Sequence, residues 1–221
     1  MDDFAIYALV DHTLLSPTAT WDDIQIICDE AIKYKTASIC IPPSYVQRVS
    51  QKYGAAINIC TVIGFPLGYS VTSSKIAEIN NASENGASEF DVVINISDAK
   101  NKNFDKITEE LTTLKSAVGN KILKVIIECC YLTTDEKIAL CKCVTQSGAD
   151  FIKTSTGFGT GGATIEDIRL FKQHIGPNVK IKAAGGMKNR EDFIAFINEG
   201  CSRLGTSSAV KVLTGVDAGS Y

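Results

Sequence analysis

The chain has 221 residues, of which 45% are hydrophobic and 21% are charged, and its formal net charge is -3 with a pI of about 5.5. These values are typical of soluble globular proteins, exclude a disordered or collagen-like chain, and give no positive field that would attract nucleic acid or an anionic membrane. Because no apolar run approaches the roughly 20 residues that span a bilayer and the N-terminus is acidic, we expect a cytoplasmic protein without a signal peptide.

Strands and helices are predicted to alternate along the whole chain, after a short N-terminal helix over about 2–9. The helices carry capping signals, as where Thr20 precedes Asp23 by three residues. Eight β-branched runs are predicted as strands: DHTLL from 11, ASICI from 37, INICTVI from 57, SEFDVVIN from 88, KILKVIIE from 121, ADFIKTS from 149, VKIKAAGG from 179 and SRLGTSS from 202. Eight strand–helix units without a break in composition favour an α/β fold, a single TIM (β/α)8 barrel over residues 1–221, rather than an open doubly wound sheet. We expect a flexible C-terminal tail at about 215–221.

Eight cysteines are spread along the chain, most of them inside apolar runs, where cysteine usually behaves as a small buried hydrophobe. Cys141 and Cys143 form a C-x-C motif, but no second cluster accompanies them, and the two histidines, His12 and His174, lie elsewhere. We therefore expect neither a disulfide framework nor a metal site.

Lys153 lies on a predicted strand and shares one face with Phe151 and Ser155. If that face points inward, an ammonium group lies inside the barrel, where a lysine needs a partner or a chemical task. The alternative is that the strand ends early and Lys153 is solvated. Similar positions on other predicted strands are occupied by three further charged residues: Lys182, Lys124 and Asp91.

An amine attacks a carbonyl group only when it is neutral, whereas an ordinary lysine, with a pKa of about 10.4, is protonated at pH 7. A second ammonium group nearby and partial desolvation both favour the neutral amine. Lys153 beside Lys182 is therefore a candidate nucleophile, with Asp91 as the group that relays protons. For Asp91 and Lys124, a structural ion pair is the alternative interpretation.

Two predicted strand ends carry small residues that suit a phosphate group, AAGGM at 183–187 and LGTSSAV at 204–210. They follow strands seven and eight, the usual phosphate site of such barrels, although tight turns also require glycine. Our candidate phosphate ligands are Gly185, Gly186, Ser207 and Ser208, with Lys188 as a possible charge partner.

Other candidates lie next to the predicted site. We expect Cys40, at the end of the second strand, to line a substrate pocket, and Thr154 and Gly157, next to Lys153, to contact substrate. His12 could serve as a general base or as a hydrogen-bonded structural residue. The glycine-rich run STGFGTGGAT at 155–164 either closes over substrate or only connects two elements.

The motifs, taken together and in order, resemble the deoxyribose-phosphate aldolase family from end to end: DHTLL at 11, ICIPP at 39, GFPLG at 64, EFDVVIN at 89, LKVIIE at 123, GADFIKTSTGF at 148, KAAGG at 182 and GTSS at 205. The resemblance implies reversible cleavage of 2-deoxy-D-ribose 5-phosphate to D-glyceraldehyde 3-phosphate and acetaldehyde in deoxyribonucleoside catabolism. It implies a homodimer that needs no metal or other cofactor. It also implies that Lys153 forms the Schiff base, that Lys182 favours the neutral form of Lys153, and that Asp91 relays protons.

The C-terminal tyrosine of the family corresponds to Tyr221, which the resemblance places in proton transfer. The chain departs from the family pattern at Phe158, where some members have a lysine, and at Met187-Lys188, where an arginine is frequent. Phe158 cannot bind phosphate, and Lys188 keeps the charge of an arginine but not its paired donors, so we expect these departures to affect phosphate affinity. Three rival functions remain: a Schiff-base aldolase with a different donor, a catalytically silent sugar-phosphate-binding barrel, and a phosphosugar isomerase.

Overall fold

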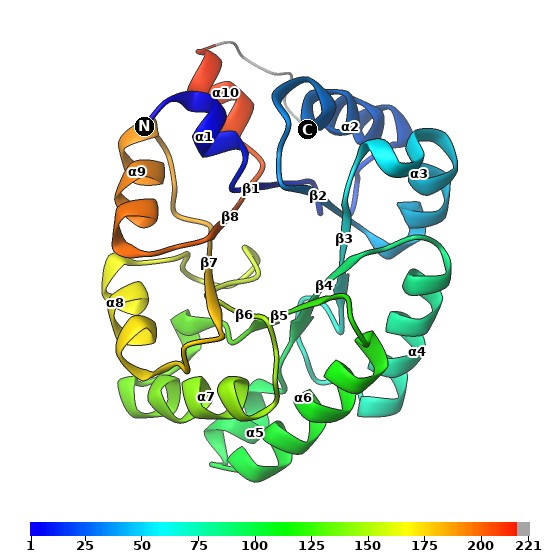
Figure 1. The fold of residues 1–221 in the computed structure, drawn as a ribbon. Coiled ribbons are helices and arrows are strands. Elements are labelled where there is room, and N and C mark those ends of the chain that lie inside the picture. The colour runs from blue at the N-terminus through cyan, green and yellow to red at the C-terminus, as the bar shows by residue number, and fades with distance from the viewer. Residues whose placement is uncertain (216–221) are drawn as a thin grey trace.

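Eight parallel strands close into a barrel, each hydrogen-bonded to the next along the chain and β8 to β1 (Figure 1). The computed structural model describes residues 1–215, so the predicted tail lies almost entirely outside the described residues. The strands are β1 (Val10–Thr13), β2 (Ser38–Ile41), β3 (Ile59–Ile63), β4 (Glu89–Val93), β5 (Ile122–Ile126), β6 (Phe151–Lys153), β7 (Lys180–Ala184) and β8 (Arg203–Thr206). The predicted TIM barrel is confirmed, and each strand lies within or beside its predicted run.

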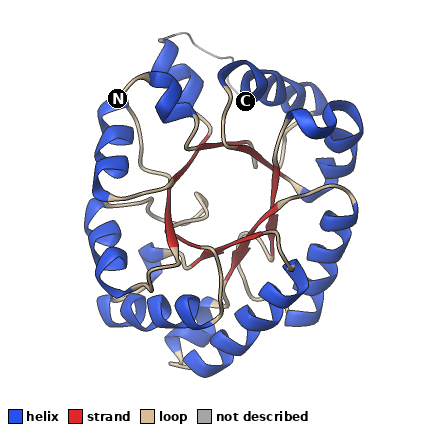
Figure 2. Ribbon diagram, in the orientation of Figure 1, coloured by secondary structure: helices blue, strands red, loops and turns tan. Residues whose placement is uncertain are grey.

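Helices surround the strands as an outer ring (Figure 2). They are α1 (Asp3–Tyr7), α2 (Trp21–Tyr34), α3 (Val46–Tyr53), α4 (Thr72–Glu84), α5 (Ile96–Lys100), α6 (Phe104–Val118), α7 (Thr134–Gln146), α8 (Ile165–His174), α9 (Arg190–Glu199) and α10 (Ala209–Thr214), with 3-10 turns at Pro43–Tyr45, Gly54–Ala56 and Cys129–Tyr131. The short N-terminal helix is present as α1. None of the helices within residues 1–215 combines the length and the apolar character that crossing a bilayer requires.

The helix starts follow from the sequence. The Thr20 hydroxyl accepts a hydrogen bond from the backbone N–H of Asp23, and the Asp23 carboxylate accepts one from the backbone N–H of Thr20, which makes a capping box at α2. The same box begins α9 at Asn189 and Asp192. The apolar faces of the helices pack against the outward side chains of the strands, and together they form the main hydrophobic core.

The inside of the barrel is filled differently from this outer core. Branched aliphatic side chains usually fill such barrels, but here the inner apolar cluster contains only Cys40, Cys60 and Val62, with Leu15 and Phe65 packed against it. Val93, Ile126 and Phe151 share the inward strand faces with buried charged side chains, which occupy the rest of the described interior. The strand register sets where they meet, because Lys153 and Lys182 are partners across β6 and β7, and Asp91 and Lys124 across β4 and β5.

Candidate active site

Lys153 ends β6, and its side chain points into the barrel. Only 2% of the residue is exposed. Its Nζ donates a hydrogen bond of 2.7 Å to Oδ2 of Asp91, which lies on β4. β6 does end at this residue, yet the lysine is not solvated, because the neighbouring strands enclose it. The ammonium group therefore has both a partner and a place at the C-terminal end of the barrel, where such barrels carry their active sites.

Asp91 is the centre of the site and is fully buried. Its Oδ2 accepts hydrogen bonds of 2.7 Å from both Lys153 and Lys182, and its Oδ1 accepts one of 3.0 Å from Lys124. Burial alone would raise the pKa of Asp91, but the ammonium groups of Lys124, Lys153 and Lys182 outweigh it and hold that pKa well below its usual value. The three lysines and the aspartate predicted to converge are thus in direct contact.

Asp11, on β1, belongs to the same network and was not predicted as a site residue. Its carboxylate contacts Lys182 and Arg203, lies 3.4 Å from Nζ of Lys124, and accepts a hydrogen bond of 2.8 Å from Ser38. Burial opposes ionisation, but the surrounding cations lower the pKa of Asp11. An acidic residue inside a predicted buried strand was the signal that could have revealed it.

Glu89 and Arg203 extend this network toward the other end of the barrel. Arg203 donates two hydrogen bonds to the Glu89 carboxylate, at 2.9 and 3.0 Å, and Nζ of Lys124 lies 2.6 Å from Glu89. Paired guanidinium–carboxylate contacts of this kind fix geometry as well as charge. We call the whole network the charge cluster, which contains Asp11, Glu89, Asp91, Lys124, Lys153, Lys182 and Arg203.

Lys124 and Lys182 remain charged within this cluster. Burial by itself would lower the pKa of each, but the carboxylates of Asp11 and Asp91 raise both values above that of an ordinary lysine. The stabilising contribution of these two lysines is therefore present below pH of about 10.4 and lost only as pH rises through their folded-state pKa. The stabilising contribution of the Asp11 and Asp91 carboxylates is present above pH of about 4 and is lost as pH falls through their own folded-state pKa.

These directions predict that Asp11 and Asp91 stay ionised at a pH where ordinary aspartates are half protonated. In ¹³C NMR of the aspartate carboxyl carbons, the resonances of Asp11 and Asp91 should hold their ionised shift at pH of about 4, where an ordinary aspartate is half protonated. Spectra of Asp11→Asn and Asp91→Asn would assign the two resonances. Titration of either resonance with an ordinary midpoint would contradict the charge balance described above.

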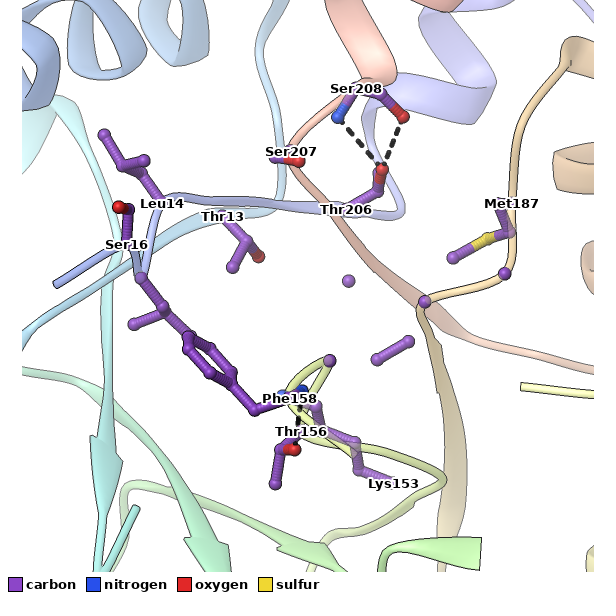
Figure 3. Close-up of a pocket in the computed structure, with 16 residues that line it drawn as sticks. Thr13, Leu14, Ser16, Lys153, Thr156, Phe158, Met187, Thr206, Ser207 and Ser208 are labelled. Atoms are coloured by element: carbon purple, nitrogen blue, oxygen red, sulfur yellow. Dashed lines mark hydrogen bonds between the residues drawn. The ribbon is translucent and has the colours of Figure 1, made fainter. Parts of the chain in front are cut away.

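A cavity of about 390 Å³ opens above Lys153 at the C-terminal end of the barrel (Figure 3). Lys153 and Thr156 lie on one side of it, and Thr206, Ser207 and Ser208 on the opposite side. Six of the predicted site residues line the cavity: Lys153, Gly157, Gly185, Gly186, Ser207 and Ser208. A lysine amino group at one side and small residues with backbone N–H groups at the other suit a substrate with a carbonyl group and an anionic end.

A model of the DeoC/LacD family aldolases matches residues 5–219. The chain belongs to this aldolase family. It is 66% identical over its full length to a deoxyribose-phosphate aldolase of Clostridium botulinum, strain Alaska E43, which it also covers completely. It is 59% identical to one from Clostridioides difficile, over 98% of this chain and 99% of the relative. A tetrameric deoxyribose phosphate aldolase structure from Aeropyrum pernix matches with a TM-score of 0.88 and 30% identity, over 98% and 93% of the two chains.

Four of the phosphate-site candidates of the aldolase line the cavity: Gly185, Gly186, Ser207 and Ser208. Gly185 and Gly186 have φ values of +72° and +80°, which only glycine adopts without strain, so their predicted role as turn residues also holds. Thr206 accepts a hydrogen bond of 3.0 Å from the backbone N–H of Ser208. The exposed Lys188 is not among the lining residues, and its backbone N–H donates to Asp192 at 2.7 Å.

Four other predicted residues lie away from the cavity wall or outside the described chain. Thr154 is buried and accepts a hydrogen bond of 3.1 Å from the backbone N–H of Ala184, so its hydroxyl joins β6 to β7. Cys40 is buried in the inner apolar cluster and does not line the cavity. His12 is buried, with Nε2 at 2.6 Å from Glu30 of α2. Tyr221 lies outside the described residues.

Glu128, two residues beyond β5, is a further feature of the site that was not predicted. It is buried and has a φ of +54°. Its carboxylate accepts hydrogen bonds of 3.1 and 3.3 Å from the backbone N–H of Thr156 and also contacts the Thr156 hydroxyl. Thr156 in turn accepts a hydrogen bond of 3.0 Å from the backbone N–H of Phe158. Glu128 thus fixes the loop that follows Lys153, and an acidic residue ending the apolar run KVIIE was the available signal.

Proposed function

We propose that the aldolase reversibly cleaves 2-deoxy-D-ribose 5-phosphate to D-glyceraldehyde 3-phosphate and acetaldehyde through a Schiff base on Lys153. The relatives at 66% and 59% identity carry the name deoxyribose-phosphate aldolase, which supports this substrate. One observation carries the mechanism: of the three cluster lysines, Lys153 lines the cavity, while Lys124 and Lys182 are fully buried beneath it.

In the cleavage direction, the neutral amine of Lys153 attacks C1 of the open-chain sugar, and loss of water gives a protonated imine. A base removes the proton of the C3 hydroxyl group, the C2–C3 bond breaks, and its electron pair enters the imine. Glyceraldehyde 3-phosphate leaves, and an enamine remains on Lys153. Protonation at C2 and hydrolysis then release acetaldehyde and the free amine.

We propose that Asp91 and Lys182 handle the protons of these steps. Asp91 Oδ2 lies 2.7 Å from both Lys153 and Lys182, so protons can pass between these side chains directly, and we propose that a water molecule in the cavity carries them to and from the substrate. Lys182 stays charged between Asp11 and Asp91, and it is the register partner of Lys153 across β6 and β7, so we propose that it assists the proton transfers of Lys153. We propose that Lys124 takes part in the same proton relay through its hydrogen bond to the other carboxylate oxygen of Asp91, Oδ1.

The decisive test is borohydride reduction in the presence of acetaldehyde, followed by peptide mass mapping. The expected product is an ethyl group on Lys153, with Lys182 and Lys124 unmodified and no adduct when acetaldehyde is left out. An adduct on another lysine, or none while the enzyme turns over, would refute the assignment.

We propose that the 5-phosphate binds at the turn of Gly185 and Gly186, through the backbone N–H of Gly186 and the hydroxyl groups of Ser207 and Ser208; the N–H of Gly185 donates a hydrogen bond of 3.4 Å to Gly205. Lys188, exposed two residues beyond Gly186, is the cation proposed to approach the bound phosphate. Cys40, Thr154 and Gly157 remain proposed substrate-binding residues, and the proposed role of Tyr221 in proton transfer falls on a residue outside the described chain.

Gly162 offers a test of the phosphate site. A Cβ atom there would lie 2.6 Å from backbone atoms of Gly185 and Gly186, so the Gly162→Ala side chain must displace that turn. We expect the KM for the phosphorylated sugar to rise about tenfold or more, with little change in kcat, because Lys153 is not touched. Steady-state kinetics checks this.

Two controls accompany the Gly162 experiment. Gly161→Ala, whose Cβ would lie 3.3 Å from the Cβ of Cys130, should leave the KM nearly unchanged. Turnover of unphosphorylated 2-deoxyribose should be equally unaffected by Gly162→Ala. A matching loss with the unphosphorylated sugar would mean that the turn does not hold phosphate.

A second candidate function is an aldolase of the same family with a different donor, because the matching family model covers more than one kind of aldolase. Assays with acetaldehyde and with ketone donors separate the two. We further propose that the enzyme acts in the cytoplasm in deoxyribonucleoside catabolism, as a homodimer without metal or organic cofactor. The Aeropyrum pernix structure is tetrameric, so light scattering of the purified enzyme is the relevant measurement.

A further inference from the structure

Cys40 and Cys60 face each other inside the barrel. They are Cα partners in the parallel ladder between β2 and β3, and both are fully buried. Adjacent strands lie about 4.8 Å apart, within the Cα separations of roughly 4.4–6.8 Å that a disulfide spans. The two sulfur atoms and a carboxylate oxygen of Asp91 all lie within 4.8 Å of one another. Among the strand pairings of residues 1–215, this is the one that joins two cysteines.

Cys60 is hydrogen-bonded directly to the charge cluster. Its thiol donates to Oδ1 of Asp91 at 3.1 Å, and its sulfur accepts a hydrogen bond of 3.2 Å from Nζ of Lys124. Contact with the Cys60 side chain lowers the pKa of Cys40, while burial raises the pKa of Cys60. Because the Cys60 thiol is engaged by Asp91 and Lys124, Cys40 is assigned as the thiol that attacks an oxidant and Cys60 as the thiol that resolves the product.

A small oxidant can reach the pair from the cavity. Leu15 and Phe65 pack against the apolar cluster of Cys40, Cys60 and Val62. Leu15 also lines the cavity, and Phe65 packs edge-on against Phe158 of the cavity wall, with ring centroids 5.3 Å apart. One layer of side chains thus separates the thiols from the substrate space. Side-chain rotations on fast time scales admit a molecule the size of hydrogen peroxide.

We propose that Cys40 and Cys60 form a reversible disulfide when the aldolase meets a peroxide, and that this bond switches the enzyme off. The Cys40 thiolate attacks one peroxide oxygen, the O–O bond breaks, and water leaves after protonation of the released hydroxide. The resulting sulfenic acid is attacked by Cys60, which forms the S–S bond and releases a second water molecule. Two thiols are oxidised and one peroxide molecule is reduced.

Inactivation follows from the lost contacts of Cys60. In the disulfide, this sulfur no longer carries the proton that it donates to Asp91, and it is drawn toward Cys40 and away from Lys124. The carboxylate that holds Lys153 and Lys182 then loses one of its donors. This step rests on the proposed roles of Lys153 and Asp91, whereas formation of the bond does not.

The test treats the full-length enzyme with hydrogen peroxide and follows activity and peptide masses under non-reducing conditions. The expected result is a linked Cys40–Cys60 peptide, with activity about tenfold or more lower in proportion to the linked fraction, and recovery with dithiothreitol. Cys60→Ser keeps a hydroxyl donor near Asp91 but cannot form the bond. Relative to its own untreated activity, this variant should resist the treatment.

The matched control is Cys130→Ser, because Cys130 is the one cysteine that is partly exposed in residues 1–215. This variant should respond to peroxide as the wild type does. Absence of the linked peptide, or an equal loss of activity in Cys60→Ser, would overturn the proposal. A linked enzyme with full activity would overturn the inactivation step alone, and borohydride labelling of the reduced enzyme separately tests whether Lys153 is the Schiff-base residue.

Discussion

Replacing Lys153 with methionine is expected to lower kcat/KM at least about 10⁴-fold while the barrel stays folded. The substitution removes the nucleophile, and removing such a residue costs several orders of magnitude in enzymes that form covalent intermediates. Folding survives because methionine fits a buried site and Asp91 keeps Lys124 and Lys182 as partners. Steady-state kinetics and circular dichroism measure the two effects.

Two further variants separate nucleophile from charge. Lys153→Arg keeps a cation near Asp91, but a guanidinium group stays protonated and cannot form the imine, so this variant should be as inactive as Lys153→Met. Lys180→Met is the matched control, because Lys180 is an exposed lysine at the other end of β7. It should retain wild-type activity. Substantial turnover by Lys153→Arg would show that Lys153 acts through its charge alone.

Asp91→Asn is expected to reduce both stability and activity strongly. Three buried ammonium groups share this carboxylate, and breaking a buried ion pair by removing one partner costs about 3–5 kcal/mol of folding free energy. Domains of this kind have a total stability of roughly 5–15 kcal/mol, so the variant should fold but unfold at lower urea concentration. Turnover per folded molecule should fall about 10³-fold or more, because the proton relay is lost.

A double-mutant cycle with Lys124→Met separates these two losses. Removing Lys124 from Asp91→Asn removes a surplus buried cation, so the double variant should recover part of the lost free energy of unfolding. Its turnover should not recover. Return of activity together with stability would mean that Asp91 only balances charge. The Lys124→Met single variant also shows whether Lys124 is catalytic or structural, the alternatives that the sequence left open.

The strands could be predicted because they are apolar, β-branched runs. Alternation placed Lys153 on one face with Phe151 and Ser155 but left open whether that face pointed inward. The alternation does not reveal which inward residues lie at the same depth, because that depends on how neighbouring strands are staggered. Lys182 is the register partner of Arg203 across β7 and β8, and Asp11 is the partner of Gly205 across β1 and β8. The contact between Asp11 and Lys182 therefore required the closed barrel.

Loop geometry limited the prediction of the cavity wall. The two small-residue segments after β7 and β8 were recognisable, since such turns need glycine and serine. The direction of a side chain beyond a turn is not periodic, so the sequence could not show that Lys188 does not line the cavity. Thr154 likewise looked like a cavity residue, but its hydroxyl is engaged by the backbone of Ala184.

The charge cluster also divides by sign along the chain. All its carboxylates come from the first four strands, and all its cations come from the last four: Asp11, Glu89 and Asp91 against Lys124, Lys153, Lys182 and Arg203. Either half of the barrel alone would bury charges of one sign without partners, and a pair of identical halves would do the same. A split after α6 would therefore yield two fragments that can pair with each other, because their buried charges are opposite, whereas neither fragment can pair with a second copy of itself. In this aldolase one half-barrel carries the buried negative charges of the cluster and the other carries the positive charges, so neither half could replace the other.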